Sequence, residues 1–437
     1  MRVLLCSIGS HGDIHPYVAV ARALRARGHE AAVVANPYFR GVVEGAGVPF
    51  LPLGGHIDLA EAIRETPGAM AQFGGSMKLV RNWLMPLLEE HTRSLMSHAR
   101  SVGAGVIVGH TITFPVPMVC EKLGLRFVAS SLAPVGWMNA NDQPCYSALD
   151  RTWPPLTLCR LNLWVGRLMM RWRIDAAVNR VRAGLGLRPV REAWYSQTRG
   201  GELNLGLWSP IFRGGYAGDP ATGVICGFPW EDRAAGHEDD MERVEAFLDA
   251  GEAPLVFTLG TASVHVAGKY FGAAAEAARV LGRRAMLVAG RREYAPADLP
   301  AGVEVFTYAP YSRVFPRALV NVHHGGIGTT AQSLRAGRPA LVTPMSHDQF
   351  DNSARLKRLG VGDRINFSAV TSGGLAGLLR HLIEDRAINE AARALGPRVA
   401  AEDGASVAAE AIIGRVGGGA KASGNGSQQC TARGVGV

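Results

Sequence analysis

A glycine-rich turn carries the clearest chemical signal in this sequence. It reads His-His-Gly-Gly-Ile-Gly-Thr-Thr over residues 323–330 and lies between an apolar run typical of a strand and a pattern typical of a helix. Glycines let a backbone approach an anion closely, and a helix start offers unpaired N–H groups and the positive end of a dipole. The turn lacks the Gly-Lys-Ser/Thr of a P-loop and the downstream acidic residue of a dinucleotide fingerprint. It therefore predicts a diphosphate site, with a turn needed only for packing as the alternative.

A second polar motif follows the next predicted strand. Residues 347–352 read His-Asp-Gln-Phe-Asp-Asn. A carboxylate beside a carboxamide supplies both acceptors and donors, which ligands rich in hydroxyl groups require. The motif favours sugar binding, and an ordinary N-terminal helix cap is the alternative interpretation.

Three titratable side chains, His11, Asp13 and His15, lie between the first predicted strand and the helix after it. A base there could take a proton from an acceptor hydroxyl while a diphosphate leaves on the other side. His15 precedes Pro16 and is biased toward an extended backbone. A structural role is therefore favoured for His15 more than for His11 or Asp13. For each of the three, turn formation without catalysis is the alternative.

The elements that must position these residues alternate between strand and helix. Within the N-terminal part, apolar runs predict strands at 3–8, 31–35 and 48–53, and helical patterns lie at 16–27 and 38–46. Such alternation predicts a parallel sheet with helices on both faces. We assign residues 1–215 to this first α/β domain.

The alternation restarts after a turn-rich and charged linker at 216–240. Strands are expected at 255–259, 285–289, 303–306, 319–323 and 340–343. Residues 241–415 thus form a second Rossmann-like, doubly wound domain, and ligands should bind between the two domains at the carboxyl ends of the strands. The tail at 416–437 is rich in Gly, Ser and Ala, and we expect it to be disordered.

Composition and charge narrow the class of protein. Of the 437 residues, 47% are hydrophobic and 19% are charged, which indicates a packed globular chain. The net charge of +9 is concentrated in 151–199, where ten Arg and four Trp accompany only two acidic residues. Because no recognised nucleic-acid-binding module accompanies this excess, we expect no nucleic-acid partner.

Cysteine usage and hydropathy bear on location. Six cysteines form no Cys-x-x-Cys pair, which fits a reduced cytoplasmic protein, and no stretch approaches 18 apolar residues. The Arg/Trp segment allows two functional interpretations, an apolar acceptor pocket or a helix that docks peripherally on the inner face of an anionic membrane. A covering helix with a solvated face is the alternative.

Together, these residues resemble the family 1 glycosyltransferases of the GT-B fold. The resemblance covers Met1 to about Ile383, and within the family it extends to the rhamnosyltransferases of rhamnolipid synthesis and to bacterial enzymes similar to sterol glucosyltransferases. It rests on the following motifs in order: Ile8 to Pro16, Arg27 to His29, Thr222 to Pro229, Pro254 to Gly260, Tyr308 to Pro310, His324 to Gly328, His347 to Asn352 and Arg358 to Gly360.

The resemblance implies roles for individual residues. It makes Asp13 the general base, with His11 as the other candidate, and it places His110 where relatives carry an Asp that orients a catalytic His. His110 would then pair with Asp13 or bind the acceptor. Tyr311 replaces a Gln of the plant relatives, so recognition of the nucleotide base should differ from theirs.

Donor and acceptor contacts follow from the same resemblance. The diphosphate would be held by His324, Gly326, Gly328, Thr329 and Thr261, while Tyr308 would stack on the nucleotide base, and Asp348 and Gln349 would hold sugar hydroxyls. We expect acceptor contacts from His15, Trp137 and Trp164.

The resulting hypothesis is an inverting, metal-independent glycosyltransferase with no cofactor beyond its donor. It would move a hexose, rhamnose or glucose, from a dTDP- or UDP-sugar to a hydroxyl of a small hydrophobic acceptor such as a hydroxy-fatty acid lipid, sterol, polyketide or flavonoid. No Asp-x-Asp pair or His/Cys cluster suggests a metal site. Two alternatives stay open: a nucleotide-sugar 2-epimerase of the same fold and a non-catalytic partner protein that binds a nucleotide sugar.

Overall fold

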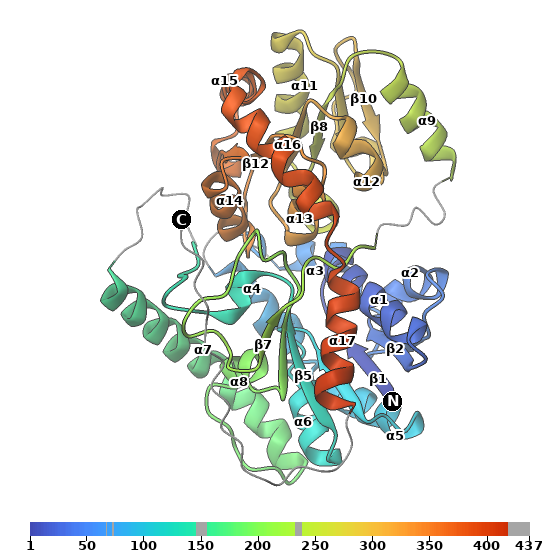
Figure 1. Ribbon diagram of the computed structural model, residues 1–437, viewed down its shortest axis with the longest axis vertical. Helices are drawn as coiled ribbons and strands as arrows, with labels where there is room; N and C mark the ends of the chain where they lie inside the picture. Colours follow the sequence, from blue (N-terminus) through green and yellow to red (C-terminus); the bar gives the residue numbers. More distant parts are fainter. Residues whose placement is uncertain (67, 72–73, 146–154, 232–237, 418–437) are drawn as a thin grey trace.

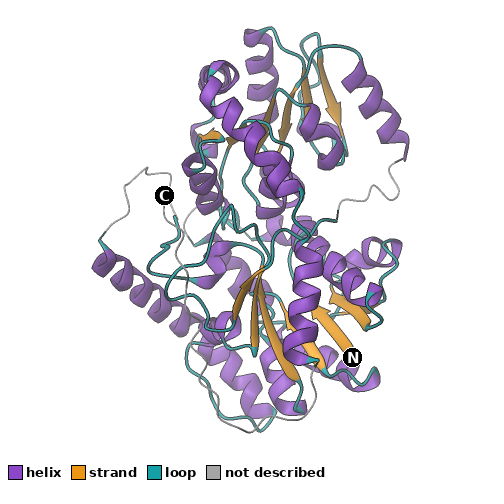
Figure 2. Ribbon diagram, in the orientation of Figure 1, coloured by secondary structure: helices purple, strands orange, loops and turns teal. Residues whose placement is uncertain are grey.

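The computed structural model describes residues 1–437 apart from 67, 72–73, 146–154, 232–237 and 418–437. It contains two parallel sheets, each covered by helices, which lie one beyond the other along the long axis of the molecule (Figure 1, Figure 2). This arrangement confirms the predicted pair of doubly wound domains.

The first sheet has seven parallel strands in the order β3-β2-β1-β4-β5-β6-β7. Its inner strand β1 (Arg2–Cys6) is apolar on both faces because helices cover both faces, and Leu4, Leu5 and Cys6 are at most 2% exposed. The strands are β1 (Arg2–Cys6), β2 (Glu30–Ala35), β3 (Phe50–Pro52), β4 (Val106–Gly109), β5 (Arg126–Ser131), β6 (Leu203–Gly206) and β7 (Gly223–Ile225). The helices are α1 (His11–Ala26), α2 (Arg40–Gly45), α3 (Leu59–Glu65), α4 (Gly75–Leu79), α5 (Leu88–Ser101), α6 (Pro115–Leu123), α7 (Leu156–Gly184) and α8 (Ala193–Arg199), with short turns η1 (Pro37–Phe39), η2 (Val80–Leu84) and η3 (Pro134–Trp137).

The second sheet has six parallel strands in the order β10-β9-β8-β11-β12-β13. They are β8 (Leu255–Thr258), β9 (Ala285–Val288), β10 (Val303–Phe306), β11 (Val320–His323), β12 (Ala340–Val342) and β13 (Gly362–Arg364). The helices of this half are α9 (Glu238–Asp249), α10 (Gly260–Ser263), α11 (Tyr270–Leu281), α12 (Tyr311–Val314), α13 (Ile327–Arg335), α14 (Gln349–Arg358), α15 (Ser372–Glu384) and α16 (Arg386–Ala400), with turns η4 (Val264–Val266), η5 (Arg292–Tyr294), η6 (Phe315–Arg317) and η7 (Phe367–Ala369). No described helix is long and apolar enough to cross a membrane.

Two boundaries differ from the predicted ones. Strand β7 lies inside the expected linker at 216–240, yet it pairs with β6 as the edge of the first sheet. The last helix, α17 (Gly404–Val416), lies at the end of the expected second domain, 241–415, but packs on α1 of the first (Figure 1). Its Ala408, Ala409 and Ile412 are fully buried in the core of the first sheet, and this burial explains why the chain crosses back. The helix includes Val416, and residues 418–437 of the expected disordered tail lie outside the described part of the chain.

The order of strands places crevices at the carboxyl ends of both sheets. In the first sheet the chain winds outward in opposite directions from the neighbouring strands β1 and β4, and in the second sheet from β8 and β11. Loops that leave such a pair diverge and open a ligand crevice. The segments after β1, β4, β8 and β11 carry Asp13, His110, Thr261 and His324, which the sequence singles out.

Candidate active site

Asp13 lies in the first turn of α1 and not in the extended loop that the sequence predicts. The helix begins at His11, well before Pro16, because Ser10 and Asp13 form a capping box. The Ser10 backbone N–H donates to Asp13 Oδ2 at 2.7 Å, and the Ser10 hydroxyl donates to the same oxygen at 3.0 Å. These bonds fix the carboxylate and leave its Oδ1 available to another partner.

His110 faces that second oxygen. Its Nε2 lies 3.7 Å from Asp13 Oδ1, which is beyond hydrogen-bond distance but within electrostatic range. Burial lowers the pKa of His110, and the nearby Asp13 carboxylate opposes this shift. The structure thus brings together the two residues that the sequence pairs, with a neutral imidazole beside the candidate base.

The two histidines on either side of Asp13, His11 and His15, have different surroundings from His110. The ring of His11 packs edge-on against Phe39 and Tyr38, at centroid distances of 5.1 and 5.8 Å, and burial lowers its pKa to about 4. His15 Nδ1 lies 3.1 Å from the backbone carbonyl of Glu231 in the segment between the domains. His15 therefore holds the interdomain segment, which is a different place from the acceptor surface expected for it.

The glycine-rich turn closes tightly around His324. A Cβ on Gly260 would lie 2.5 Å from His324 Cε1, and a Cβ on Gly326 would lie 2.5 Å from its Nε2, so only glycines leave room for the ring. His324 is 8% exposed, and burial lowers its pKa to about 4, with a further contribution from His347. Its Nδ1 is buried and has no hydrogen-bond partner among the residues that the structure describes. A neutral ring with an unsatisfied nitrogen is suited to bind a ligand atom.

Helix α13 begins directly after this turn, with Gly326 as its N-cap. Gly328 is exposed and Thr329 is buried in the first turn of the helix. The N–H groups of this turn have no partner inside the helix, and the helix dipole adds positive potential. The expected diphosphate ligands His324, Gly326, Gly328 and Thr329 are thus brought together at one helix end.

Asp348 lies beside the glycine-rich turn at the start of α14. Asn352 Nδ2 donates to Asp348 Oδ2 at 2.7 Å and to the carbonyl of Gly325 at 2.8 Å, which ties the carboxylate to the turn. Burial raises the pKa of Asp348 to about 7, the bond from Asn352 opposes this, and the Asp13 carboxylate adds to it. Asn352, to which the sequence pattern assigns no role, thus holds this carboxylate against the turn.

Gln349 is fully engaged with protein groups. Its Oε1 accepts from the N–H groups of Met345 and Ser346 at 2.8 and 3.1 Å, and its Nε2 donates to Ser263 Oγ at 3.2 Å. It is 4% exposed. In this structure it fixes the loop before α14, so sugar hydroxyls would have to compete for its amide.

The two crevices face each other across the domain boundary. A Cβ on Gly328 would lie 3.8 Å from the Cα of Gly12, so the starts of α13 and α1 are in close approach. His347, whose φ of 57° is rare for a residue with a side chain, places Nδ1 2.5 Å from Ser76 Oγ of α4. Asp13 and Asp348 therefore line one site built by both domains. The sequence motif contains His347, but no signal in it indicates the contact with Ser76.

The remaining expected donor contacts, Thr261 and Tyr308, follow the carboxyl ends of β8 and β10. Thr261 is exposed in α10, next to Gly260. Tyr308 is half-buried in the loop between β10 and α12. The neighbouring Tyr311 stacks on Phe315 at 4.5 Å, and its hydroxyl lies 2.8 Å from Thr258 Oγ1. Tyr311 thus joins the end of β8 to α12.

The two tryptophans expected at the acceptor do not share one surface. Trp137 is 2% exposed and packs against Trp208 at 4.7 Å in a buried cluster. The Trp137 side chain is buried in this core cluster, so it presents no surface to an acceptor. Trp164 is 61% exposed on α7. Sequence alone does not distinguish these cases, because a tryptophan in an apolar run suits either a core or a ligand surface.

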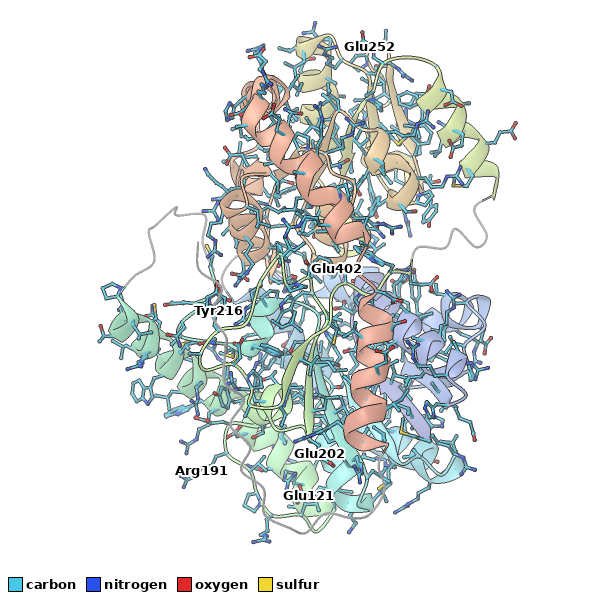
Figure 3. All side chains as sticks on the ribbon, in the orientation of Figure 1. Glu121, Arg191, Glu202, Tyr216, Glu252 and Glu402 are labelled. Atoms are coloured by element: carbon cyan, nitrogen blue, oxygen red, sulfur yellow. The ribbon has the colours of Figure 1, made fainter. Side chains whose placement is uncertain are left out.

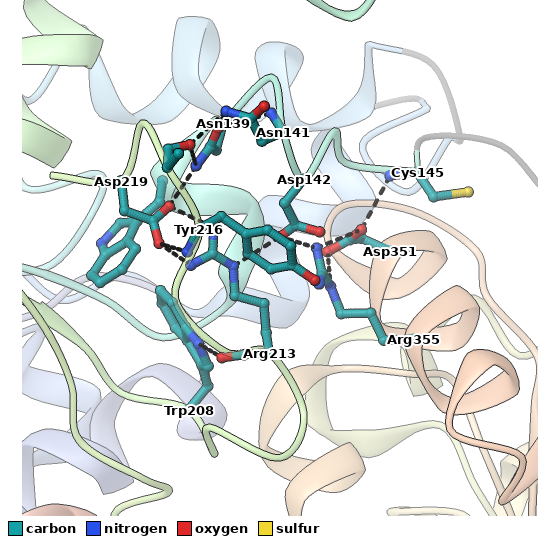
Figure 4. A network of polar contacts seen from close by, with 12 residues as sticks. Asn139, Asn141, Asp142, Cys145, Trp208, Arg213, Tyr216, Asp219, Asp351 and Arg355 are labelled. Carbon is teal, nitrogen blue, oxygen red and sulfur yellow. Dashed lines mark hydrogen bonds and ion pairs between the residues drawn. The ribbon is translucent and has the colours of Figure 1, made fainter. Parts of the chain in front are cut away.

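A buried ionic network joins the domains beside the site (Figure 4). Asp142 Oδ2 accepts from Arg213 Nε at 2.8 Å and from Arg355 Nη2 at 2.9 Å. Arg355 of α14 also donates to Asp351 at 2.8 Å, and Asp351 accepts from the N–H of Cys145 at 3.1 Å. These contacts fix α14, and with it Asp348, relative to the first domain.

Two family models match this chain. The Glycosyltransferase family 28 N-terminal domain matches residues 3–135, and the Erythromycin biosynthesis protein CIII-like C-terminal domain matches residues 284–413. The first range holds Asp13 and His110, and the second holds His324 and Asp348. The matched ranges therefore contain both halves of the site.

Similar proteins span almost the whole chain. An O-mycaminosyltylonolide 6-deoxyallosyltransferase of Streptomyces fradiae is 32% identical over 416 residues, 92% of this chain and 95% of that protein. A sterol 3-beta-glucosyltransferase of Arabidopsis thaliana is 26% identical over 423 residues, 94% of this chain and 65% of that protein. Among solved structures, spinosyn rhamnosyltransferase SpnG complexed with thymidine diphosphate has 18% identity and a TM-score of 0.66, and the match covers 96% of this chain and 100% of that one.

Proposed function

Because this chain belongs to the glycosyltransferases of the GT-B fold, we propose that it transfers a hexose, with inversion, from a nucleoside diphosphate sugar to a hydroxyl of an apolar small molecule. The observation that carries this proposal is that Asp13 and the glycine-rich turn of His324 lie on opposite sides of one site at the domain boundary. One side of the site offers a carboxylate oxygen, and the other offers a helix N-terminus with a neutral histidine.

The proposed reaction is a single displacement at the anomeric carbon. Asp13 Oδ1 takes the proton of the acceptor hydroxyl, the acceptor oxygen forms a bond to the anomeric carbon, and the bond from that carbon to the diphosphate oxygen breaks. Oδ2 stays hydrogen-bonded to Ser10, so the carboxylate is held in place during proton transfer. The His110 imidazole, whose Nε2 lies 3.7 Å from Oδ1, is the side chain placed to interact with that oxygen during proton transfer.

The leaving diphosphate would gain its charge beside α13. Backbone N–H groups of Gly328 and Thr329, together with His324, would stabilise that charge as it develops. This arrangement supports a transfer that needs no metal ion. Asp348, at the same end of the site, would bind a sugar hydroxyl.

Donor and acceptor classes are proposed from the relatives and from the surface near Asp13. The names of the similar proteins point to deoxysugar or glucose donors, a thymidine diphosphate ligand, and macrolide or sterol acceptors. Tyr38, which is 46% exposed, packs against His11 next to the base and offers apolar surface to an acceptor. We therefore favour dTDP- or UDP-linked rhamnose or glucose and an acceptor with one reactive hydroxyl on an apolar body.

A donor and acceptor matrix tests the proposal. Purified protein is incubated with dTDP- and UDP-sugars and with hydroxy acids, sterols, macrolide aglycones and flavonoids, and products are followed by mass spectrometry and by NMR of the anomeric proton. Transfer with inverted anomeric configuration is the expected result. Isomerised nucleotide sugar without transfer would instead indicate a 2-epimerase. Binding of the donor with no reaction on any acceptor would indicate the non-catalytic partner.

The acceptor series also tests the apolar class. Burying apolar surface contributes about 25 cal/mol per Å², so affinity should rise with chain length or ring count while the donor KM stays nearly constant. Small hydrophilic sugars that outperform every apolar acceptor would refute this part of the proposal and leave the transferase activity standing.

A further inference from the structure

The first half of α7 exposes a large apolar surface to solvent. It projects from the body of the first domain (Figure 1, Figure 3). Exposed fractions reach 53% at Leu161, 61% at Trp164 and 78% at Trp172. The other exposed apolar residues of this half are Leu156, Leu158, Val165, Leu168 and Met169.

All of these side chains except Leu156 form one stripe along the helix. At about 100° per residue, the seven positions 158, 161, 164, 165, 168, 169 and 172 fall within an arc of roughly 140°. The opposite side of the helix carries the residues that pack on the body. Cys159 and Ile174 are buried there, and Met170 joins the cluster that contains Ile174. The stripe is therefore the outward face of an amphipathic helix, here called the α7 stripe.

Arginines line both margins of the α7 stripe. By the same geometry Arg160 and Arg171 lie along one edge, and Arg173 lies along the other. All three are exposed, and none forms an ion pair with another described residue. Arg167 is different, because it pairs with Glu192. From Leu156 to Ile174 the helix contains no acidic residue.

We propose that the α7 stripe docks on an anionic phospholipid bilayer, with the helix lying in the plane of the interface. An apolar face bordered by basic residues and containing tryptophan has the composition of interfacial helices. The apolar side chains would enter the acyl boundary while the arginine stems reach outward to the headgroup phosphates. The stripe is convex, which a fluid bilayer accommodates without a preformed groove.

Charge and composition disfavour two other occupants of the stripe, a second copy of this chain and its C-terminal tail. Two copies packed stripe to stripe would bring arginine margins together, and like charges at a shared interface are repulsive. The tail at 418–437 contains no Leu, Ile, Met, Phe, Tyr or Trp, so its sequence offers no apolar partner for the stripe. Docking of this kind is independent of the transfer reaction, and it can be measured without donor or acceptor.

Vesicle sedimentation tests the proposal with the full-length protein. Wild type is mixed with phosphatidylcholine vesicles or with mixed phosphatidylcholine–phosphatidylglycerol vesicles, at low and at high salt. We expect binding to the anionic vesicles alone, weakened by salt because screening shortens the range of the charges. Arg160→Gln with Arg171→Gln should lower partitioning roughly 30-fold, since each basic residue near an anionic surface contributes about 1 kcal/mol.

A second pair of variants tests the apolar part. Leu161→Asp with Trp172→Asp should abolish vesicle binding. Val280→Asp on α11 is the matched control, because Val280 is 51% exposed in the other domain, and it should bind as wild type does. Thermal melts of all variants verify that they fold.

Three results would overturn the proposal. The first is wild type that stays off anionic vesicles. The second is unchanged vesicle binding by Leu161→Asp with Trp172→Asp. The third is a wild-type dimer in sedimentation velocity that this double variant converts to a monomer, which would make the stripe an interface between copies. Wild type that is monomeric and free of vesicles would leave another protein as the occupant.

Discussion

Among single residues, Asp13 is distinguished by the different surroundings of its two carboxylate oxygens. Oδ2 is held by Ser10, whereas Oδ1 faces His110 and the site. Asp13→Asn keeps an oxygen for the capping bonds but cannot accept the acceptor proton as a carboxylate does. We expect kcat to fall by about 10² to 10⁴ while nucleotide affinity is unchanged. Steady-state kinetics and calorimetry with dTDP and UDP measure both, and near-wild-type turnover would transfer the base assignment to His11.

His324 makes the opposite prediction, because it acts on the donor side. Its buried, unpartnered Nδ1 lies in the glycine-rich turn, and a bond to phosphate contributes roughly 0.5 to 3 kcal/mol. His324→Ala should therefore weaken nucleotide affinity by about 2-fold to 150-fold and lower turnover with it. The measurement is calorimetric titration with dTDP and with UDP. Unchanged affinity for both would place the diphosphate elsewhere.

The same histidines predict a dependence of stability on pH. Burial lowers the pKa of His323 to about 3 and that of His324 to about 4, each from 6.5. The folded state therefore binds fewer protons than the unfolded state between these values, so stability is full above pH 6.5 and falls as the pH drops toward 4. The slope per histidine is at most about 1.4 kcal/mol per pH unit. Urea unfolding of wild type at several pH values should show this loss, and His324→Ala should show a shallower one; identical slopes would contradict the assignment.

At the scale of elements, the start of α1 depends on Gly9. Its φ of 140° is unfavourable for other residues, and a Cβ there would lie 2.2 Å from Asp13 Oδ2. Gly9→Ala should thus displace the carboxylate and lower both stability and kcat. Gly28→Ala is the matched control, because Gly28 has a φ of 80° but nothing within 4 Å of a Cβ. We expect the control to lose only about 1 kcal/mol of stability and to keep its kcat. Equal kcat values for the two variants would show that Gly9 does not position Asp13.

Elements were predictable from the sequence where hydrophobic runs are bounded by turn residues. The expected strands at 303–306 and 319–323 match β10 and β11. The start of α1 was not predicted correctly, because Pro16 suggested a first helical turn, whereas the Ser10 and Asp13 capping box starts the helix earlier. Boundaries follow local hydrogen bonds, and a run of residue types records those less clearly than it records burial.

At the scale of the whole molecule, the sequence predicts the two domains and the segments that meet between them. It does not predict the partners that hold the domains together. Helix α17 has the composition of an ordinary helix of the second domain, and only the three-dimensional packing shows that it covers α1. Near it lies Glu402, at the junction of the two domains (Figure 3). Glu402 accepts a hydrogen bond from the Ser209 hydroxyl at 2.5 Å, although the two residues are far apart in the chain. Long-range pairs of this kind leave no periodic signal in one sequence.

The ionic network around Asp142 yields the prediction that belongs to this scale. Asp142, Arg213 and Arg355 have side chains at most 4% exposed, so a lost carboxylate would leave two buried guanidinium groups with fewer partners. Removing one partner of a buried ion pair costs about 3 to 5 kcal/mol, whereas an exposed helical pair contributes about 0.3 to 0.5 kcal/mol. Asp142→Asn should therefore lower the midpoint of thermal unfolding clearly, and Glu390→Gln, which breaks the exposed pair with Arg386, should not.

The same variant should also affect the donor site. Arg355 and Asp351 belong to α14, whose start carries Asp348, so a loosened network lets that carboxylate shift relative to Asp13. We expect Asp142→Asn to raise the donor KM in assays well below its unfolding midpoint, because binding then includes the cost of ordering α14 against the first domain. Glu390→Gln should keep the wild-type KM. A stable Asp142→Asn protein with an unchanged KM would show that the network neither holds the domains together nor positions the donor site.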